Sequence, residues 1–264
     1  MMSSFKLTAV LSLLLLAGCS PSKNQTKTPA AAEVNRVPAK FDFSPPSRAA
    51  AASAGITIAI VKPTYVGKNA EYYVPPFNEM ASSMGNDFEE LLTAKGFSVR
   101  GPFGSRDEMV YNDKLNSSFI IEIGIDINPD YKRKYNSYSK TNWGSLLDKN
   151  APASIESYKM HGEITLAGNL VINAKSAQYG ELIWKKNISL DAASFTYDGS
   201  VTWDGIPTMA EELKKDNLVY NTLSRELEKF YDKALSLAWQ QIDPAEMKVV
   251  ADQGKKADKR SNMP

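Results

Sequence analysis

The chain has 264 residues, of which 43% are hydrophobic and 10% aromatic, so one domain can bury a sizeable core. Its 31 basic and 30 acidic residues nearly cancel, which argues against a nucleic-acid partner because such proteins favour a basic footprint. A single cysteine allows no disulfide within one molecule, and a single histidine excludes a histidine-based metal site. The core must therefore hold without covalent crosslinks.

Residues 1–18 have the parts of a bacterial lipoprotein signal peptide. Lys6 supplies a positive start, and an apolar stretch too short to span a bilayer comfortably follows it. Leu16-Ala17-Gly18-Cys19 then matches the pattern that lipoprotein signal peptidases recognise. We expect cleavage after residue 18 and a covalent lipid on Cys19, with no other cofactor.

Residues 19–54 carry the lipidated N-terminus and a predicted flexible linker. The segment is rich in Pro, Ala, Ser, Thr and Lys and has almost no apolar periodicity, which is typical of an extended tether. Ser20, not Asp, follows Cys19, which resembles the default signal for the outer membrane. We expect a lipid-anchored protein of the cell outer membrane, on its surface or its periplasmic face.

The folded region, residues 55–244, begins with a strand and a helix. Residues 56–61 are a β-branched run ended by a proline, which predicts a central strand covered on both faces. In residues 77–92 apolar side chains recur every three or four positions, which predicts an amphipathic helix, and Gly96 is placed to end it.

Several further elements follow. A short strand is expected at 97–103 and a short helix near 107–114. Apolar residues occupy the odd positions of 119–127, a period of two that predicts one face toward the core and one toward water. The same alternation in 164–172 and 182–190, with a turn between them, predicts a hairpin.

A long amphipathic helix closes the folded region. Its apolar residues run through 223–238, Asp216 or Asn217 is placed to cap it, and Pro244 to end it. Residues 245–264 mix charges without an apolar stripe, so we expect a solvated, flexible tail. The order of elements predicts a single α+β domain, with a mostly antiparallel sheet and helices packed on one face.

No local signature of an enzyme is present, since the chain lacks the nucleophile elbow, the P-loop and the dinucleotide fingerprint. Catalysis by scattered carboxylates stays open as an alternative. Residues 126–130 gather oxygen ligands but lack the glycine and terminal glutamate of the familiar calcium loop, so they predict a strand ending in a turn. The lone His161 is expected to be structural. We therefore expect a non-enzymatic protein without a metal.

Residues 129–158 are the candidate binding segment, predicted as a long loop between two strands. Cations and aromatic residues alternate in it, and such loops are often binding loops or disordered ones. Aromatic faces stack on sugar rings and cations pair with carboxylates, so an acidic glycan is one reading. The other is a solvated loop that shields the sheet edge. The candidate ligand-binding residues are Tyr131, Lys132, Arg133, Lys134, Tyr135 and Lys140.

Four short matches occur in order behind the lipidation motif. They are Val61-Lys62-Pro63, the join Lys95-Gly96-Phe97-Ser98-Val99, the strand end Asn128-Pro129-Asp130, and the helix from Asp216-Asn217 to Gln241-Ile242-Asp243. On these residues the chain resembles the neuraminyllactose-binding haemagglutinin family, typified by an adhesin lipoprotein of Helicobacter.

The resemblance implies a sialic-acid motif just after Pro129-Asp130. The motif falls on Lys132 and Arg133, and more loosely on Lys134 and Lys140, because the chain departs there from the family's further paired lysines. It implies an adhesin that binds sialylated or acidic glycans. The alternative is a periplasm-facing structural or assembly lipoprotein of the envelope, secretion or flagellar-sheath apparatus, whose segment would dock an envelope protein. The membrane is the expected partner in both cases, and nucleic acid in neither.

Overall fold

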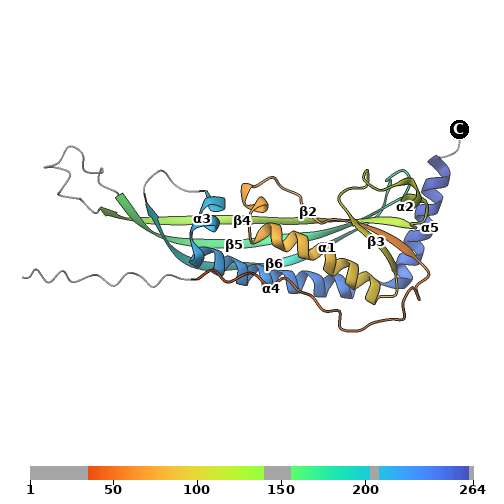
Figure 1. Cartoon of the computed structure of the whole chain (residues 1–264), viewed down its shortest axis with the longest axis horizontal. Coiled ribbons are helices and arrows are strands. Elements are labelled where there is room, and N and C mark those ends of the chain that lie inside the picture. Colours follow the sequence, from red (N-terminus) through yellow and green to blue (C-terminus); the bar gives the residue numbers. More distant parts are fainter. Residues whose placement is uncertain (1–34, 140–155, 203–207, 262–264) are drawn as a thin grey trace, which may run out of the picture. The chain divides into compact units, whose positions relative to one another are not determined.

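The computed structural model describes residues 35–139, 156–202 and 208–261 (Figure 1). The described residues all belong to one compact unit. The signal peptide and Cys19 therefore lie outside the described residues. The strands are β1 (Thr57–Val61), β2 (Thr64–Tyr65), β3 (Ser98–Phe103), β4 (Phe119–Ser139), β5 (Glu156–Lys175) and β6 (Leu182–Thr202). The helices are η1 (Ala70–Tyr73), α1 (Phe77–Ala94), α2 (Tyr111–Leu115), α3 (Met209–Lys215), α4 (Asn217–Gln241) and α5 (Pro244–Ser261).

The six strands form one sheet in the order β3-β1-β4-β5-β6, with β2 also paired to β4. β1 is parallel to β3 and to β4, whereas β4, β5 and β6 are antiparallel to one another. The predicted α+β class with a mostly antiparallel sheet is therefore confirmed. The central position of the first strand is confirmed as well, because β1 lies between two partners and Ala59 and Ile60 are fully buried.

The main core lies between the sheet and helices α1 and α4, which run alongside the strands (Figure 1). The alternation in β4 directs Ile121 and its odd-numbered neighbours into this core, where they are almost fully buried. α1 ends where predicted, because Gly96 adopts a φ of +88° and the Phe97 amide donates to the Leu92 carbonyl. α4 begins at the predicted cap, where the Asp216 carboxylate accepts from the Leu218 and Val219 amides.

The predicted loop at 129–158 is wrong at both of its ends, because residues 129–139 and 156–158 belong to strands. β4 continues to Ser139, and its ladder with β5 is unbroken from Ile120 opposite Lys175 to Ser139 opposite Glu156. The apolar alternation stops at Ile127, but backbone hydrogen bonds to β5 continue, and these need no apolar side chains. Residues 126–130 therefore stay in the strand and form no turn. Residues 140–155 lie outside the described part.

A proline inside β4 is compatible with this extension. The partner β2 ends opposite Ile125, so farther along the chain β4 is paired with β5 and its other side is free of β2. Pro129 has no amide hydrogen to donate, and prolines are tolerated on such a strand edge. From the sequence pattern alone, the strand was predicted to end at this proline.

Part of the predicted tether is also wrong, because residues 35–54 pack along α1 and α4 as a strap. The Val37 amide donates to Asn221 and the Ala49 amide to the Ala94 carbonyl. Phe41 and Phe43 are each 8% exposed within the core. Two phenylalanines two positions apart give no visible periodicity, yet they are enough to dock the segment on both helices.

The predicted flexible tail is a helix, α5, for most of its length. Met247, Val250 and Ala251 belong to the core cluster, and Ala257 is fully buried. Gly254 brings the helix close to the sheet, since a Cβ there would lie 2.8 Å from the Ser118 carbonyl oxygen. The buried residues have helical spacing, but many of them are small. The charged residues between them therefore hide the amphipathic pattern in the sequence.

Across the ranges that the structure describes, no helix combines the length and apolarity needed to cross a membrane.

Candidate functional site

The side chains of the predicted site residues on β4 do not all point to the same face of the sheet. Successive side chains of a strand point to opposite faces, and the burial follows this rule: Tyr131 and Arg133 are partly buried, whereas Lys132 and Lys134 are exposed. The side chain of Tyr135 and the whole of Lys140 lie outside the described residues. Lys132 and Arg133 are therefore not brought together on one surface.

Arg133 is held by a buried acid. Its Nη1 lies 3.3 Å from Glu212 Oε1 of α3, and the two side chains are 14% and 4% exposed. Tyr197 Oη is 3.4 Å from the other oxygen of the same carboxylate. Its ring passes over β5 at Gly162, where a Cβ would lie 2.2 Å from it. Arg133, Gly162 and Tyr197 occupy one row across three strands, so the arrangement joins α3 to the sheet.

The electrostatics of this cluster follow from its burial. Desolvation raises the pKa of Glu212, and the Arg133 guanidinium opposes that rise. Burial likewise raises the pKa of the Tyr197 phenol. A guanidinium engaged in this way is a structural group that has little freedom to bind a ligand.

Tyr131 is similarly engaged on the same face of β4. Its hydroxyl donates to Glu71 Oε1 of η1 at 3.2 Å. The Arg133 guanidinium lies 5.9 Å from its ring centroid. Tyr131 therefore ties η1 to the sheet.

Lys132 and Lys134 lie on the opposite, polar face. Lys134 is in register with His161 of β5, which in turn pairs with Asp198 of β6. His161 Nδ1 and Asp198 Oδ1 are 2.8 Å apart, and both side chains are exposed. The predicted structural role of His161 fits this pairing. No group of three or more metal-ligating side chains is found in the described ranges.

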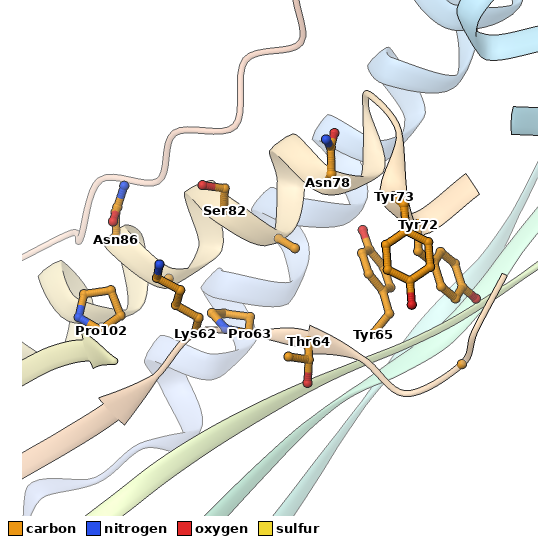
Figure 2. A pocket seen from close by; sticks show the side chains of 13 residues that line it. Lys62, Pro63, Thr64, Tyr65, Tyr72, Tyr73, Asn78, Ser82, Asn86 and Pro102 are labelled. Carbon is orange, nitrogen blue, oxygen red and sulfur yellow. The ribbon is translucent and has the colours of Figure 1, made fainter. Parts of the chain in front are cut away.

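A cleft of about 520 Å³ lies elsewhere, between β2, η1 and α1 (Figure 2). Lys62 and Pro63, which follow β1, and Pro102, near the end of β3, line it, so it lies at the carboxyl ends of these two parallel strands. Gly85 of α1 lies against its floor, since a Cβ there would be 3.1 Å from Pro63. Its volume is within the range of small-molecule sites.

One wall of the cleft is polar. Asn78, Ser82 and Asn86 lie four residues apart on α1, so they share one face of the helix. All three are exposed. Figure 2 shows them along the helix, with the tyrosines toward one end of the cleft and Lys62 and Pro102 toward the other. This wall offers amide and hydroxyl groups to a ligand.

Three tyrosines form the aromatic end. The rings of Tyr65 and Tyr72 stack with centroids 4.2 Å apart. Tyr65 Oη donates to the Phe77 carbonyl at 2.8 Å, and Tyr72 Oη donates to the Ile127 carbonyl. Burial raises the pKa of both phenols. These hydrogen bonds fix the pair, while Tyr73 is 72% exposed and available to a ligand.

A polar stripe along α1 is the sequence signal for this cleft. The helix prediction for 77–92 rests on its apolar positions, whereas Asn78, Ser82 and Asn86 form a polar stripe at the same helical spacing. The meeting of this stripe with the tyrosines of the 65–73 segment depends on the path of the chain around β2 and η1. Sequence spacing does not specify that path.

Comparisons with known proteins identify a shared fold but no family. No family model matches the chain, and no curated protein matches its sequence. The fold is similar to that of a putative neuraminyllactose-binding hemagglutinin homolog from Helicobacter pylori, with a TM-score of 0.53 and 13% identity. The match covers 83% of this chain and 100% of that one. At this identity it shows a shared fold, and a fold does not carry a function with it.

Two further structures overlap less well. PelC from Paraburkholderia phytofirmans gives a TM-score of 0.23 at 11% identity, covering 69% of this chain and 92% of that one. The lipoprotein GNA1162 from Neisseria meningitidis gives 0.22 at 10% identity, covering 66% and 97%. Overlaps this small support no structural argument.

Proposed function

We propose that the protein is a lipid-anchored, non-enzymatic binding protein of the bacterial outer membrane, and that it holds an acidic glycan in the cleft between β2, η1 and α1. The observation that carries the proposal is the lining of this cleft, which combines tyrosine rings, a row of amide and hydroxyl groups, and the Lys62 ammonium.

Each part of the lining suits a sugar that bears an acid. The exposed ring of Tyr73 offers a flat apolar face, which a sugar ring can cover. Asn78, Ser82 and Asn86 donate and accept hydrogen bonds, as ring hydroxyls require. Lys62, an exposed cation, complements a carboxylate such as that of a sialic acid.

The same lining argues against hydrolysis. Glycosidases use a pair of carboxyl groups on either side of the bond that they cleave. None of the residues that line the cleft, all of them in the described part of the chain, is an Asp, Glu, His or Cys. We therefore infer binding without turnover.

The envelope location is inferred from the sequence. The signal peptide and the lipidation motif at Cys19 support it, and the family resemblance points to the same compartment. On this reading an outward-facing domain would act as an adhesin.

The test is binding of the purified chain to an array of sialylated, uronic-acid and neutral oligosaccharides. Ser82→Trp fills the cleft with an indole, so we expect it to abolish binding to the acidic sugars. Thr93→Trp is the matched control, because Thr93 is an exposed residue of the same helix that does not line the cleft. It should bind as the parent does.

A second pair of changes separates the cleft from the sequence-predicted motif. Lys132→Ala/Lys134→Ala removes two exposed cations that do not line the cleft and that point away from η1, which Tyr131 contacts from the other face of β4. Unchanged binding is expected. Loss of binding in this variant, with normal binding by Ser82→Trp, would place the ligand on β4 and reject the cleft.

A further inference from the structure

Helix α5 presents a basic outer face. Its buried side carries Met247, Val250, Ala251 and Ala257, which pack on the domain. The opposite side has exposed residues at helical spacing, and half of them are cations. These cations are Lys248, Lys255, Lys256, Lys259 and Arg260. One side of the helix is therefore apolar and buried, and the other side is basic and exposed.

The acids of α5 do little to neutralise this face. Asp258 is buried and accepts a hydrogen bond from the Gln178 amide of the β5–β6 turn. Glu246 accepts from Trp184 Nε1 of β6 at 2.8 Å. Asp252 is exposed among the cations. Attraction to the negative end of the helix dipole explains basic residues in the last turn, but not Lys248, which lies near the start.

Apolar side chains are also exposed on α5 and at the neighbouring β5–β6 turn. Val249, on the outer face of α5, is 58% exposed. Tyr179 and Leu182, in and after the turn that Asp258 joins to α5, are 46% and 53% exposed. Exposed cations with a few apolar and aromatic side chains are the composition of surfaces that bind the membrane interface.

We propose that the outer face of α5 binds an anionic phospholipid surface, as a second membrane contact besides the lipid. The inference rests on the proposed envelope location of the protein but not on the glycan cleft. The strap enters at the start of α4, where the Val37 amide meets Asn221, and α5 follows the end of α4. The tether would then join the domain near the start of α4, and α5 would contact lipid beyond its end.

Phospholipid fits this face better than an anionic polymer does. A polymer would be bound by the cations alone, whereas exposed Val249 and Leu182 gain from burial in an interface of headgroups and acyl chains. The predicted tether also keeps the domain near a membrane.

The test measures co-sedimentation of the mature chain with vesicles. A Cys19→Ala background removes the lipid, so that the result does not depend on the anchor. We expect binding to vesicles of equal parts phosphatidylglycerol and phosphatidylcholine, little binding to phosphatidylcholine alone, and loss of binding at about 1 M salt. Lys255→Gln/Lys256→Gln should weaken binding about 25-fold, because each basic residue near such a surface contributes a factor of about five.

Lys132→Gln/Lys134→Gln is the matched control, since it removes the same charge from exposed positions of β4. It should bind as the parent does. Equal binding to both vesicle types, an unchanged α5 variant, or an equal loss in the control would each overturn the proposal. Binding to purified peptidoglycan without binding to vesicles would overturn it in favour of an anionic polymer.

Discussion

Arg133 shows how the structure changes the meaning of a single residue. As part of a sialic-acid motif it would be expendable for folding, but its guanidinium is paired with the buried Glu212. Arg133→Ala leaves that carboxylate without its partner, and breaking such a pair costs about 3 kcal/mol. We expect this loss in the free energy of unfolding, measured by urea denaturation.

The neighbouring Lys132 is the control for this prediction. It is exposed on the other face of β4, so Lys132→Ala should change stability by no more than about 0.5 kcal/mol. Equal effects of the two substitutions would contradict the paired role of Arg133. Any loss of ligand binding in Arg133→Ala should follow the loss of folded protein.

Asp87 predicts a pH dependence. Burial raises the pKa of its carboxyl, and hydrogen bonds from Tyr231 Oη at 2.5 Å and the Phe43 amide at 2.7 Å oppose the rise. Because the folded-state pKa lies above the unfolded one, the associated stabilisation is complete below the unfolded pKa. It is lost as the pH rises through the folded pKa.

Asp87→Asn should remove this loss, since the amide oxygen still accepts hydrogen bonds but carries no charge to desolvate. Relative to the parent, the variant should gain stability as the pH rises from about 4 to about 7. Urea midpoints across this range measure the difference. Burial also raises the pKa values of Glu212 and Asp232. Both residues are present in the parent and the variant, so their contributions to the difference in stability cancel. A constant difference would contradict the prediction.

Among the elements, the strap of residues 35–54 makes the clearest prediction. The Phe41 ring lies 5.3 Å from that of Tyr231 on α4, centroid to centroid, and is 8% exposed. Phe41→Ala should cost about 3 kcal/mol of unfolding free energy and make the strap sensitive to limited proteolysis. Val37→Ala, at a 59% exposed position, is the control and should leave both measurements unchanged.

The elements that sequence patterning identified share one property: a regular row of large apolar residues. α1, α4 and the first part of β4 have such rows, and their limits were predicted closely. α5 is buried through Ala251, Gly254 and Ala257, and the strap through Phe41 and Phe43, so neither has a row of that kind. The second half of β4 is held by backbone pairing with β5, which leaves no mark on the pattern. The cleft was missed because its polar and aromatic lining comes from elements separated in the chain.

For the whole molecule, the strap shortens the reach of the proposed lipid anchor. If residues 20–54 were all free, they would span up to about 120 Å when fully extended, whereas residues 20–34 span at most about 50 Å. With the proposed lipid on Cys19, the docked strap would keep the domain closer to the membrane than a tether of residues 20–54 would. That shorter reach favours a second contact between α5 and lipid.

The same tether provides a test of the side of the membrane on which the domain acts. Trypsin cleaves after lysine, and Lys23 and Lys27 lie between Cys19 and the strap. If the protein is an outward-facing adhesin, trypsin added to intact cells should release an intact folded domain into the medium, as detected by antibody, while a periplasmic marker protein stays with the cells. A domain that stays with the cells until they are lysed would contradict the adhesin and favour a periplasm-facing assembly protein. Its cleft would then be expected to hold a ligand from inside the envelope.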